Sequence, residues 1–212
     1  MADPHNTIAF QGAPGANSDM ACRAVYPDME TQPCNAFEDA FEAVTSAQAK
    51  YAMIPIDNSV AGRVADIHHL MPDSGLYIIG EHYQRVNHQL LTVPGTNIAD
   101  ITHVHSHVHA LNQCRNLIRE LGVQPVVHAD TAGAARDIAE WADKTQAALS
   151  SSLAAGLYGL ETLRDEAEDA AHNTTRFVIM SREPNVPAHG SAAMVTTFVF
   201  RVRNVPAALY KA

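Results

Sequence analysis

One short run of the sequence combines side chains that can bind and activate a small anionic molecule. Residues 173–177 read Asn-Thr-Thr-Arg-Phe and stand directly before the apolar residues 178–180. Arg176 can hold a carboxylate through two parallel hydrogen bonds, and the neighbouring hydroxyls can donate further ones. An exposed arginine at the polar start of a strand explains the same run without any ligand, so both interpretations stay open.

A second run places polar side chains directly behind a proline. Residues 54–59 read Ile-Pro-Ile-Asp-Asn-Ser, and Gly62 follows shortly after. The proline restricts the backbone, so the run is suited to present Asn58 and Ser59 to a ligand. A local Asx turn accounts for the same residues.

The glycine-rich turn at residues 12–18, Gly-x-x-Gly-x-x-Ser, is less specific. It lacks the paired glycines of a dinucleotide-binding turn and the Gly-Lys-Ser/Thr of a phosphate-binding loop. A tight turn with a helix cap and a ligand loop explain it equally well.

Alternating histidines invite comparison with a metal site; they are His103, His105, His107 and His109. A strand that ends near His105, followed by a helix after Ser106, would prevent them from sharing one face. No cysteine or carboxylate cluster stands beside them in the sequence. We therefore predict surface or packed histidines and no metal.

The chain as a whole alternates short apolar runs with helical patterns. This order predicts a parallel α/β sheet covered on both faces. An apolar stripe over residues 110–121 predicts a helix ended by Gly122, and a second helix is expected over residues 131–141. Such folds bind ligands at the carboxyl ends of strands, where helix N-termini favour anions.

Composition excludes several classes of protein. The 212 residues are 47% hydrophobic and 17% charged, which is typical of a globular chain of one or two domains. A net charge of −9 argues against a nucleic-acid partner. No apolar stretch approaches the ~18–20 residues of a membrane span. Three cysteines without CxxC spacing, and no recognisable signal peptide, predict a cytoplasmic protein.

Two stretches have the composition of joints. Residues 72–75 precede an apolar strand at 76–79, where we expect the chain to cross into a second lobe. Residues 182–191 are rich in proline and small residues, as linkers are. Beyond them we expect a strand over residues 194–202 and a helix from Asn204, which together resemble the opening of a truncated domain.

In chain order, these segments resemble the prephenate dehydratase family, whose members convert prephenate to phenylpyruvate. The matching motifs are the glycine turn at 12–18, Ile-Pro-Ile-Asp-Asn-Ser at 54–59, Ser-His-x-x-Ala-Leu-x-Gln-Cys at 106–114, Asp-Thr-Ala-x-Ala-Ala at 130–135 and Asn-Thr-Thr-Arg-Phe at 173–177. They cover about the first 180 residues. Asp57 and Ala61 depart from the glutamates that are usual in the family.

The resemblance implies a two-lobed α/β fold of the type II periplasmic-binding-protein kind, with the active-site cleft between the lobes. The catalytic domain would span residues 1–182, with lobe I at about 1–78 and 162–182 and lobe II at about 79–161. Residues 183–192 would form a linker. Residues 193–212 would be a truncated ACT segment, the α+β regulatory domain of the family.

The resemblance also implies an activity: the decarboxylating dehydration of prephenate, with release of water and CO2, in L-phenylalanine biosynthesis. It implies no cofactor and no metal, a cytoplasmic homodimer or homotetramer, and an L-phenylalanine effector in a full-length form. Thr175 would be catalytic, donating to the departing ring hydroxyl. The implied substrate-binding residues are Asn58, Ser59, Ser106, Gln113, Thr131, Arg176 and Phe177. The implied, incomplete effector site comprises Asn204, Ala208 and Leu209.

Two alternatives remain. Arogenate dehydratases act on the aminated form of the same substrate and share these motifs. A non-catalytic, two-lobed sensor of a small ligand would have the same fold.

Overall fold

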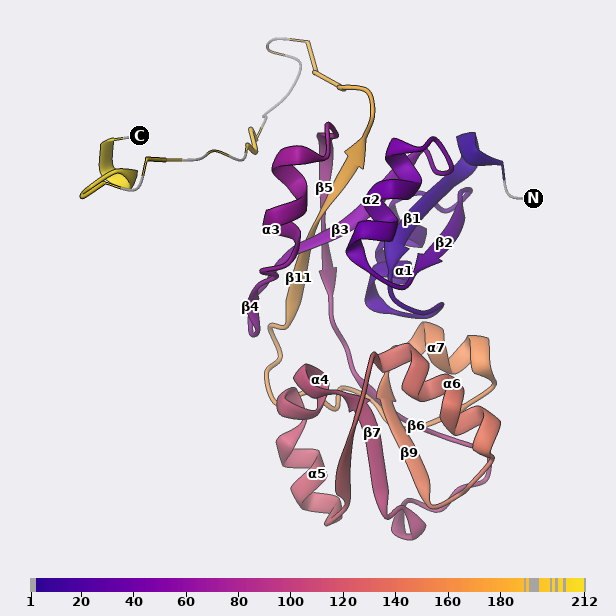
Figure 1. Ribbon diagram of the computed structural model, residues 1–212. Helices are drawn as coiled ribbons and strands as arrows, with labels where there is room; N and C mark the ends of the chain where they lie inside the picture. Colours follow the sequence, from indigo (N-terminus) through magenta and orange to yellow (C-terminus); the bar gives the residue numbers. More distant parts are fainter. Residues whose placement is uncertain are drawn as a thin grey trace.

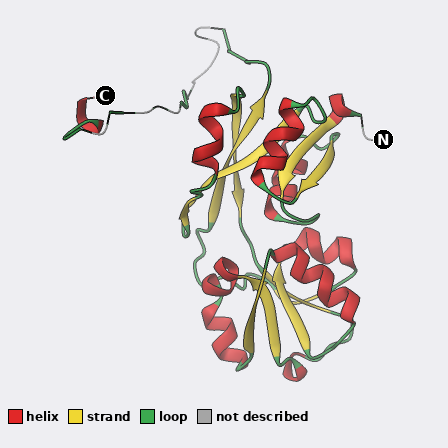
Figure 2. Cartoon of the chain, in the orientation of Figure 1, coloured by secondary structure: helices red, strands yellow, loops and turns green. Residues whose placement is uncertain are grey.

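The computed structural model describes residues 3–188, 190, 195–198, 200, 202–203 and 205–211. These residues form two α/β lobes, each built on one sheet (Figures 1 and 2). The two-lobed α/β fold is as predicted. Both sheets are mixed rather than parallel, because the chain passes from the first lobe to the second and back, and its returning strands run in the opposite direction.

The first lobe contains the sheet with strand order β2-β1-β3-β11-β5, and β4 pairs with the C-terminal end of β3. Its strands are β1 (Thr7–Gln11), β2 (Glu30–Cys34), β3 (Tyr51–Asn58), β4 (Gly62–Arg63), β5 (Tyr77–Arg85) and β11 (Thr174–Ser181). Its helices are α1 (Asn17–Val25), α2 (Phe37–Thr45) and α3 (Ile67–Leu70), with short 3-10 turns at Pro4–Asn6 and Met71–Asp73.

The second lobe contains the sheet with strand order β10-β6-β9-β7-β8. Its strands are β6 (Gln89–Thr92), β7 (His103–His107), β8 (Gln124–His128), β9 (Gln146–Ser150) and β10 (Glu161–Arg164). Its helices are α4 (Val108–Gln113), α5 (Arg115–Leu121), α6 (Thr131–Trp141) and α7 (Ser152–Tyr158), with a 3-10 turn at Ile98–Asp100.

The helix predictions for this lobe are confirmed with one change. Helix α6 has the predicted bounds, and Gly122 ends α5 in the left-handed conformation. The single helix predicted over residues 110–121 is divided at Cys114, whose backbone is not helical. The division lets α4 and α5 follow different directions.

The lobe boundaries differ from those that the sequence suggested. Strand β5 pairs with β11, so residues 79–85 belong to the first lobe. Strand β10 pairs with β6, so residues 161–164 belong to the second. The chain therefore crosses at about residues 86–88 and again at about 165–173. The two crossing segments are tied together, because Val86 N donates to the Asn173 carbonyl (2.9 Å).

Three apolar clusters form the core. One lies within each lobe, around Ile54 in the first and Leu149 in the second. The third joins the lobes, since it contains Phe10 and Phe177 from the first sheet and Ile138 from α6. This shared cluster holds the two lobes together on one side.

The C-terminal segment does not form the strand that was predicted over residues 194–202. The described residues in that range, 195–198, 200 and 202, are outside any strand, and a 3-10 turn at Leu209–Lys211 stands where a helix was expected. Asn204 lies outside the described residues, and Leu209 is exposed. Residues 183–188 and 190, within the predicted linker, have no helix or strand.

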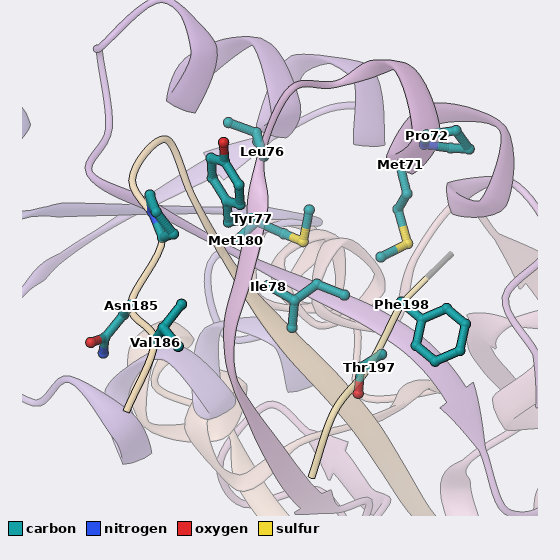
Figure 3. Close-up of a pocket in the computed structure, with 11 residues that line it drawn as sticks. Met71, Pro72, Leu76, Tyr77, Ile78, Met180, Asn185, Val186, Thr197 and Phe198 are labelled. Atoms are coloured by element: carbon teal, nitrogen blue, oxygen red, sulfur yellow. The ribbon is translucent and has the colours of Figure 1, made fainter. Parts of the chain in front are cut away.

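Part of this segment covers a small hollow of about 340 Å³ on the outer side of the first lobe. Figure 3 shows the apolar side chains of Met71, Ile78 and Phe198 around it. No Asp, Glu, Lys, Arg or His is among the described residues that line it. The hollow therefore offers no charge to an anionic ligand.

No helix in the described part of the chain is long and apolar enough to cross a membrane.

Candidate active site

The larger hollow is a cleft of about 640 Å³ between the two lobes. The end of β3, the start of β11 and the N-terminus of α1 line it from the first lobe, and the N-termini of α4 and α6 line it from the second (Figure 1). The ends of strands and the starts of helices therefore line the cleft, as the sequence predicted. The partial positive charges at the starts of α1 and α6 favour an anionic ligand.

Thr175 and Asn58 lie side by side on paired strands at the wall of this cleft. They are register partners of β11 and β3, and both line the cleft. The Asn58 Nδ2 atom donates to Thr175 Oγ1 at 2.9 Å. The sequence separation of this pair is large, so only the antiparallel return of β11 brings the two side chains together.

The direction of this hydrogen bond follows from the backbone. The Oδ1 atom of Asn58 accepts from the amides of Val60 (3.0 Å) and Ala61 (2.7 Å), which can only donate. The amide NH₂ of Asn58 must therefore face Thr175, whose oxygen accepts. The hydroxyl proton of Thr175 consequently points elsewhere, and within the described residues it has no protein acceptor.

The polar network continues from Asn58 into the second lobe. The Nδ2 atom of Asn58 also donates to Asn173 Oδ1 (2.8 Å), and Asn173 Nδ2 donates to Gln113 Oε1 (2.8 Å). The ring of His88 lies 3.1 Å from the same Gln113 oxygen. Gln113 and His88 line the cleft. The network therefore joins both crossing segments to helix α4.

Arg63 is the only arginine or lysine among the described residues that line the cleft. It stands on the short strand β4, directly after Gly62. His107 and His109 line the opposite wall, and burial lowers the pKa of His107. A neutral His107 adds a hydrogen-bonding group rather than a charge, so Arg63 is the permanent cation among the described residues that line the cleft. The carboxyl groups of Asp66 and Asp130 also belong to the lining.

Five of the eight residues predicted for the site line the cleft: Asn58, Gln113, Thr131, Thr175 and Phe177. Two of the other three serve the protein backbone. The Ser106 side chain is fully buried and donates to the Leu149 carbonyl at 2.6 Å. The Ser59 hydroxyl donates to the His172 carbonyl at 2.7 Å and accepts from Thr174 N at 2.9 Å. Neither of these serines is part of the cleft lining.

Arg176 is the third exception, and it corrects the predicted carboxylate contact. Successive side chains of a strand point to opposite faces, so Arg176 lies on the face away from Thr175. Its Nε donates to Glu81 Oε2 at 2.9 Å, and its guanidinium lies 5.9 Å from the centre of the Tyr83 ring. Arg176 is thus paired within the first lobe and does not line the cleft.

The histidine run does not divide where the sequence suggested, because β7 continues to His107 and α4 begins at Val108. His103, His105 and His107 are therefore alternate residues of one strand, and His109 is on the helix. His105 is buried, contacts the rings of His128 and Trp141, and its Nε2 lies 2.7 Å from Gln146 Oε1. Among the described residues, no group of three or more His, Cys, Asp or Glu side chains is placed to hold a metal ion.

The glycine turn serves the contact between the lobes. The Ser151 hydroxyl donates to the Gly15 carbonyl, and the Tyr158 hydroxyl donates to the Pro14 carbonyl at 2.8 Å. A Cβ atom on Gly15 would lie 2.9 Å from Ala154 Cα, so a glycine is required there for helix α7 to approach. Gly12, at the other end of the turn, lines the cleft.

Sequence reasoning missed three polar residues of the site: Arg63, His88 and Asn173. Arg63 follows the quoted Pro-Ile-Asp-Asn-Ser motif, and Asn173 opens the Asn-Thr-Thr-Arg-Phe run, so both had a local signal. His88 is a single histidine before an apolar strand. Its place in the cleft lining and its contact with Gln113, 25 residues away, reveal it.

The chain is similar to known proteins over most of its length. The prephenate dehydratase family profile matches residues 8–185. A bifunctional N-acyl-homoserine lactone acylase/prephenate dehydratase of Komagataeibacter europaeus is 52% identical over 97% of this chain and 73% of its own length. An arogenate dehydratase/prephenate dehydratase of Arabidopsis thaliana is 40% identical over 97% of this chain, which spans only 52% of that relative.

Among solved structures, the prephenate dehydratase of Arthrobacter aurescens in complex with L-Phe superposes with a TM-score of 0.79. It is 31% identical, over 86% of this chain and 62% of that one. Because the family profile covers most of the sequence, and a relative that carries prephenate dehydratase in its name is 52% identical, the chain belongs to the prephenate dehydratase family.

Proposed function

We propose that this chain catalyses the decarboxylating dehydration of prephenate to phenylpyruvate, with Thr175 as the catalytic residue. The observation that carries the proposal is the hydrogen-bond direction at Thr175. Its oxygen accepts a hydrogen bond from Asn58, and its proton has no acceptor among the described residues. The hydroxyl is therefore available as a donor in the cleft.

The reaction needs little more than a donor at the leaving group. The ring carboxylate leaves as CO2, and the electron pair of the broken C–C bond enters the ring. The ring becomes aromatic as the C–O bond to the ring hydroxyl breaks. One proton is taken up, so that the departing hydroxide becomes water. A donor that shares its proton with this oxygen in the transition state is typically worth ~10²–10⁴-fold in rate.

The positive groups of the cleft are candidates for holding the carboxylates of the substrate. Arg63 and the N-terminus of α1 supply positive charge from the lobe that carries Thr175, and the N-terminus of α6 supplies it from the second lobe, while the carboxyl groups of Asp66 and Asp130 also line the cleft. The pyruvyl carboxylate keeps its charge throughout the reaction and gains most from such a partner. We assign Arg63 to carboxylate binding in place of Arg176.

The remaining lining residues take binding roles in this proposal. Asn58 positions Thr175, Gln113 offers its amide to the substrate, and Thr131 stands at the start of α6. Phe177, on the same face of β11 as Thr175, provides an apolar wall beside the ring.

The test is the formation of phenylpyruvate, which absorbs in alkaline solution, from prephenate added to the purified chain. We expect catalytic turnover that persists after treatment with a metal chelator. Tight binding of prephenate without turnover would instead support the sensor alternative and contradict the proposal.

The relatives suggest two further substrates for the same assay. Arogenate differs by an ammonium group, which a guanidinium such as that of Arg63 disfavours, so we expect a lower kcat/KM with arogenate than with prephenate. The name of the Komagataeibacter relative also includes acylase activity. Release of fatty acid from an N-acyl-homoserine lactone, measured alongside, would show whether this chain shares that second activity.

Two partner predictions accompany the proposal. An L-phenylalanine effector in a longer form of the chain is tested by prephenate turnover with and without L-phenylalanine. A homodimer or homotetramer is tested by the mass of the chain in sedimentation experiments.

A further inference from the structure

His88 is a buried histidine at the wall of the cleft, on the segment that carries the chain into the second lobe. It is 3% exposed, and burial lowers the pKa of its ring. Its backbone is held on both sides, because His88 N donates to Glu168 Oε2 (2.9 Å) and the His88 carbonyl accepts from Ala167 N (2.8 Å). The ring thus has a fixed position.

The hydrogen-bond directions found at Asn58 extend to this ring. The NH₂ group of Asn58 faces Asn173, so Asn173 Oδ1 accepts and its own NH₂ group faces Gln113. The Gln113 oxygen must therefore accept from Asn173. Because an amide oxygen cannot donate, the His88 Nε2 atom, 3.1 Å away, carries the ring proton.

The orientation of the Gln113 oxygen also determines where the NH₂ group of the same amide points. Its oxygen accepts two hydrogen bonds, from Asn173 and from His88, and an amide oxygen has two lone pairs. Its NH₂ group makes no hydrogen bond to any described residue, and Gln113 lines the cleft. A rotation of this amide by half a turn would set its NH₂ against two donors.

We propose that His88 is a positioning residue: its Nε2–H locks the Gln113 amide so that the NH₂ group is presented to an acceptor oxygen of the substrate. The proposal rests on the proposed function, since prephenate supplies that oxygen. The Nδ1 atom of His88 is buried and has no hydrogen-bond partner among the described residues. This fits the assignment, because Nδ1 carries no proton in the Nε2–H tautomer and therefore needs no acceptor.

The first test compares two substitutions at this position. His88→Leu removes the donor and keeps an apolar side chain, whereas His88→Gln places an NH₂ group near the position of Nε2. We expect His88→Leu to raise the KM for prephenate about tenfold with kcat changed by less than about threefold, as loss of uniform binding does. His88→Gln should restore most of the KM. His69→Leu, at an exposed histidine of α3, is the matched control and should leave both constants unchanged.

The second test needs no turnover, and it uses the folded His88→Gln variant only to assign the signals. Long-range ¹H–¹⁵N spectra of the labelled chain distinguish the two neutral histidine tautomers. We expect the His88 signals, assigned by their loss in His88→Gln, to be those of the Nε2–H form.

An Nδ1–H form would overturn the proposal, and so would equal KM values for wild type and His88→Leu. Equal losses in His88→Leu and His88→Gln would also overturn it, because they would indicate packing rather than donation. A wild-type chain that does not consume prephenate would refute the proposed function, while the tautomer would still report on the positioning of Gln113.

Discussion

The two faces of strand β11 differ in what they do, although their residues are neighbours in one motif. Thr175 faces the cleft, accepts from Asn58 and keeps its proton free. Arg176, one residue later, faces away and is paired with Glu81 across the β11–β5 contact. One motif on a strand can therefore serve two tasks: one face for chemistry, the other for holding the edge strand β5 in place.

The largest effect after that of Thr175 itself is expected at Asn58. Asn58→Leu removes the donor that orients Thr175 and the bond that continues to Asn173, so we expect kcat to fall about 10–100-fold, the cost of losing one or two hydrogen bonds at the reacting group. Steady-state turnover of prephenate measures it. An unchanged kcat in a folded Asn58→Leu variant would remove Asn58 from the account.

A middle-sized effect separates the two arginines. Arg63→Gln removes the cation of the cleft, and we expect the KM for prephenate to rise about tenfold, the loss of roughly one charged contact. Arg176→Gln is the matched control on the other face, and its KM should stay within about twofold of wild type. The reverse ranking of the two KM values would restore Arg176 as the carboxylate contact.

The smallest effect concerns stability on the outer face. Arg176 and Glu81 are each 29% exposed, so their ion pair is partly screened by solvent. We expect Glu81→Gln to lower the free energy of unfolding by about 0.2–1 kcal/mol, with no effect on turnover. Urea unfolding of the variant and wild type measures this difference, and a loss of activity at unchanged stability would contradict the separation of the two faces.

The elements that local pattern specifies were predictable from the sequence. Helix α6 has its predicted bounds because Asp130 caps its first turn and its apolar residues recur with the helical period. The left-handed end at Gly122 is likewise a local property. The motif at residues 54–59 indicated Asn58, and the family resemblance implied Thr175; both line the cleft.

What the sequence could not supply depends on pairing between distant segments. The lobe boundaries depend on the partners of β5 and β10, which no local pattern identifies. His88 lines the cleft and contacts Gln113 on another element, and both relations depend on the folded arrangement of distant segments. The error at Arg176 has a different origin: strand alternation alone predicts that Thr175 and Arg176 face opposite ways, whereas the motif was interpreted as a single cluster.

The proposed activity depends most on the hydroxyl proton of Thr175, which has no acceptor among the described residues. Prephenate turnover by Thr175→Val and Thr175→Ser, both verified as folded, tests it directly, since valine has nearly the shape of threonine without its hydroxyl. We predict that kcat falls ~10²–10⁴-fold in Thr175→Val and by less than about tenfold in Thr175→Ser. A kcat near that of wild type in Thr175→Val would contradict the account.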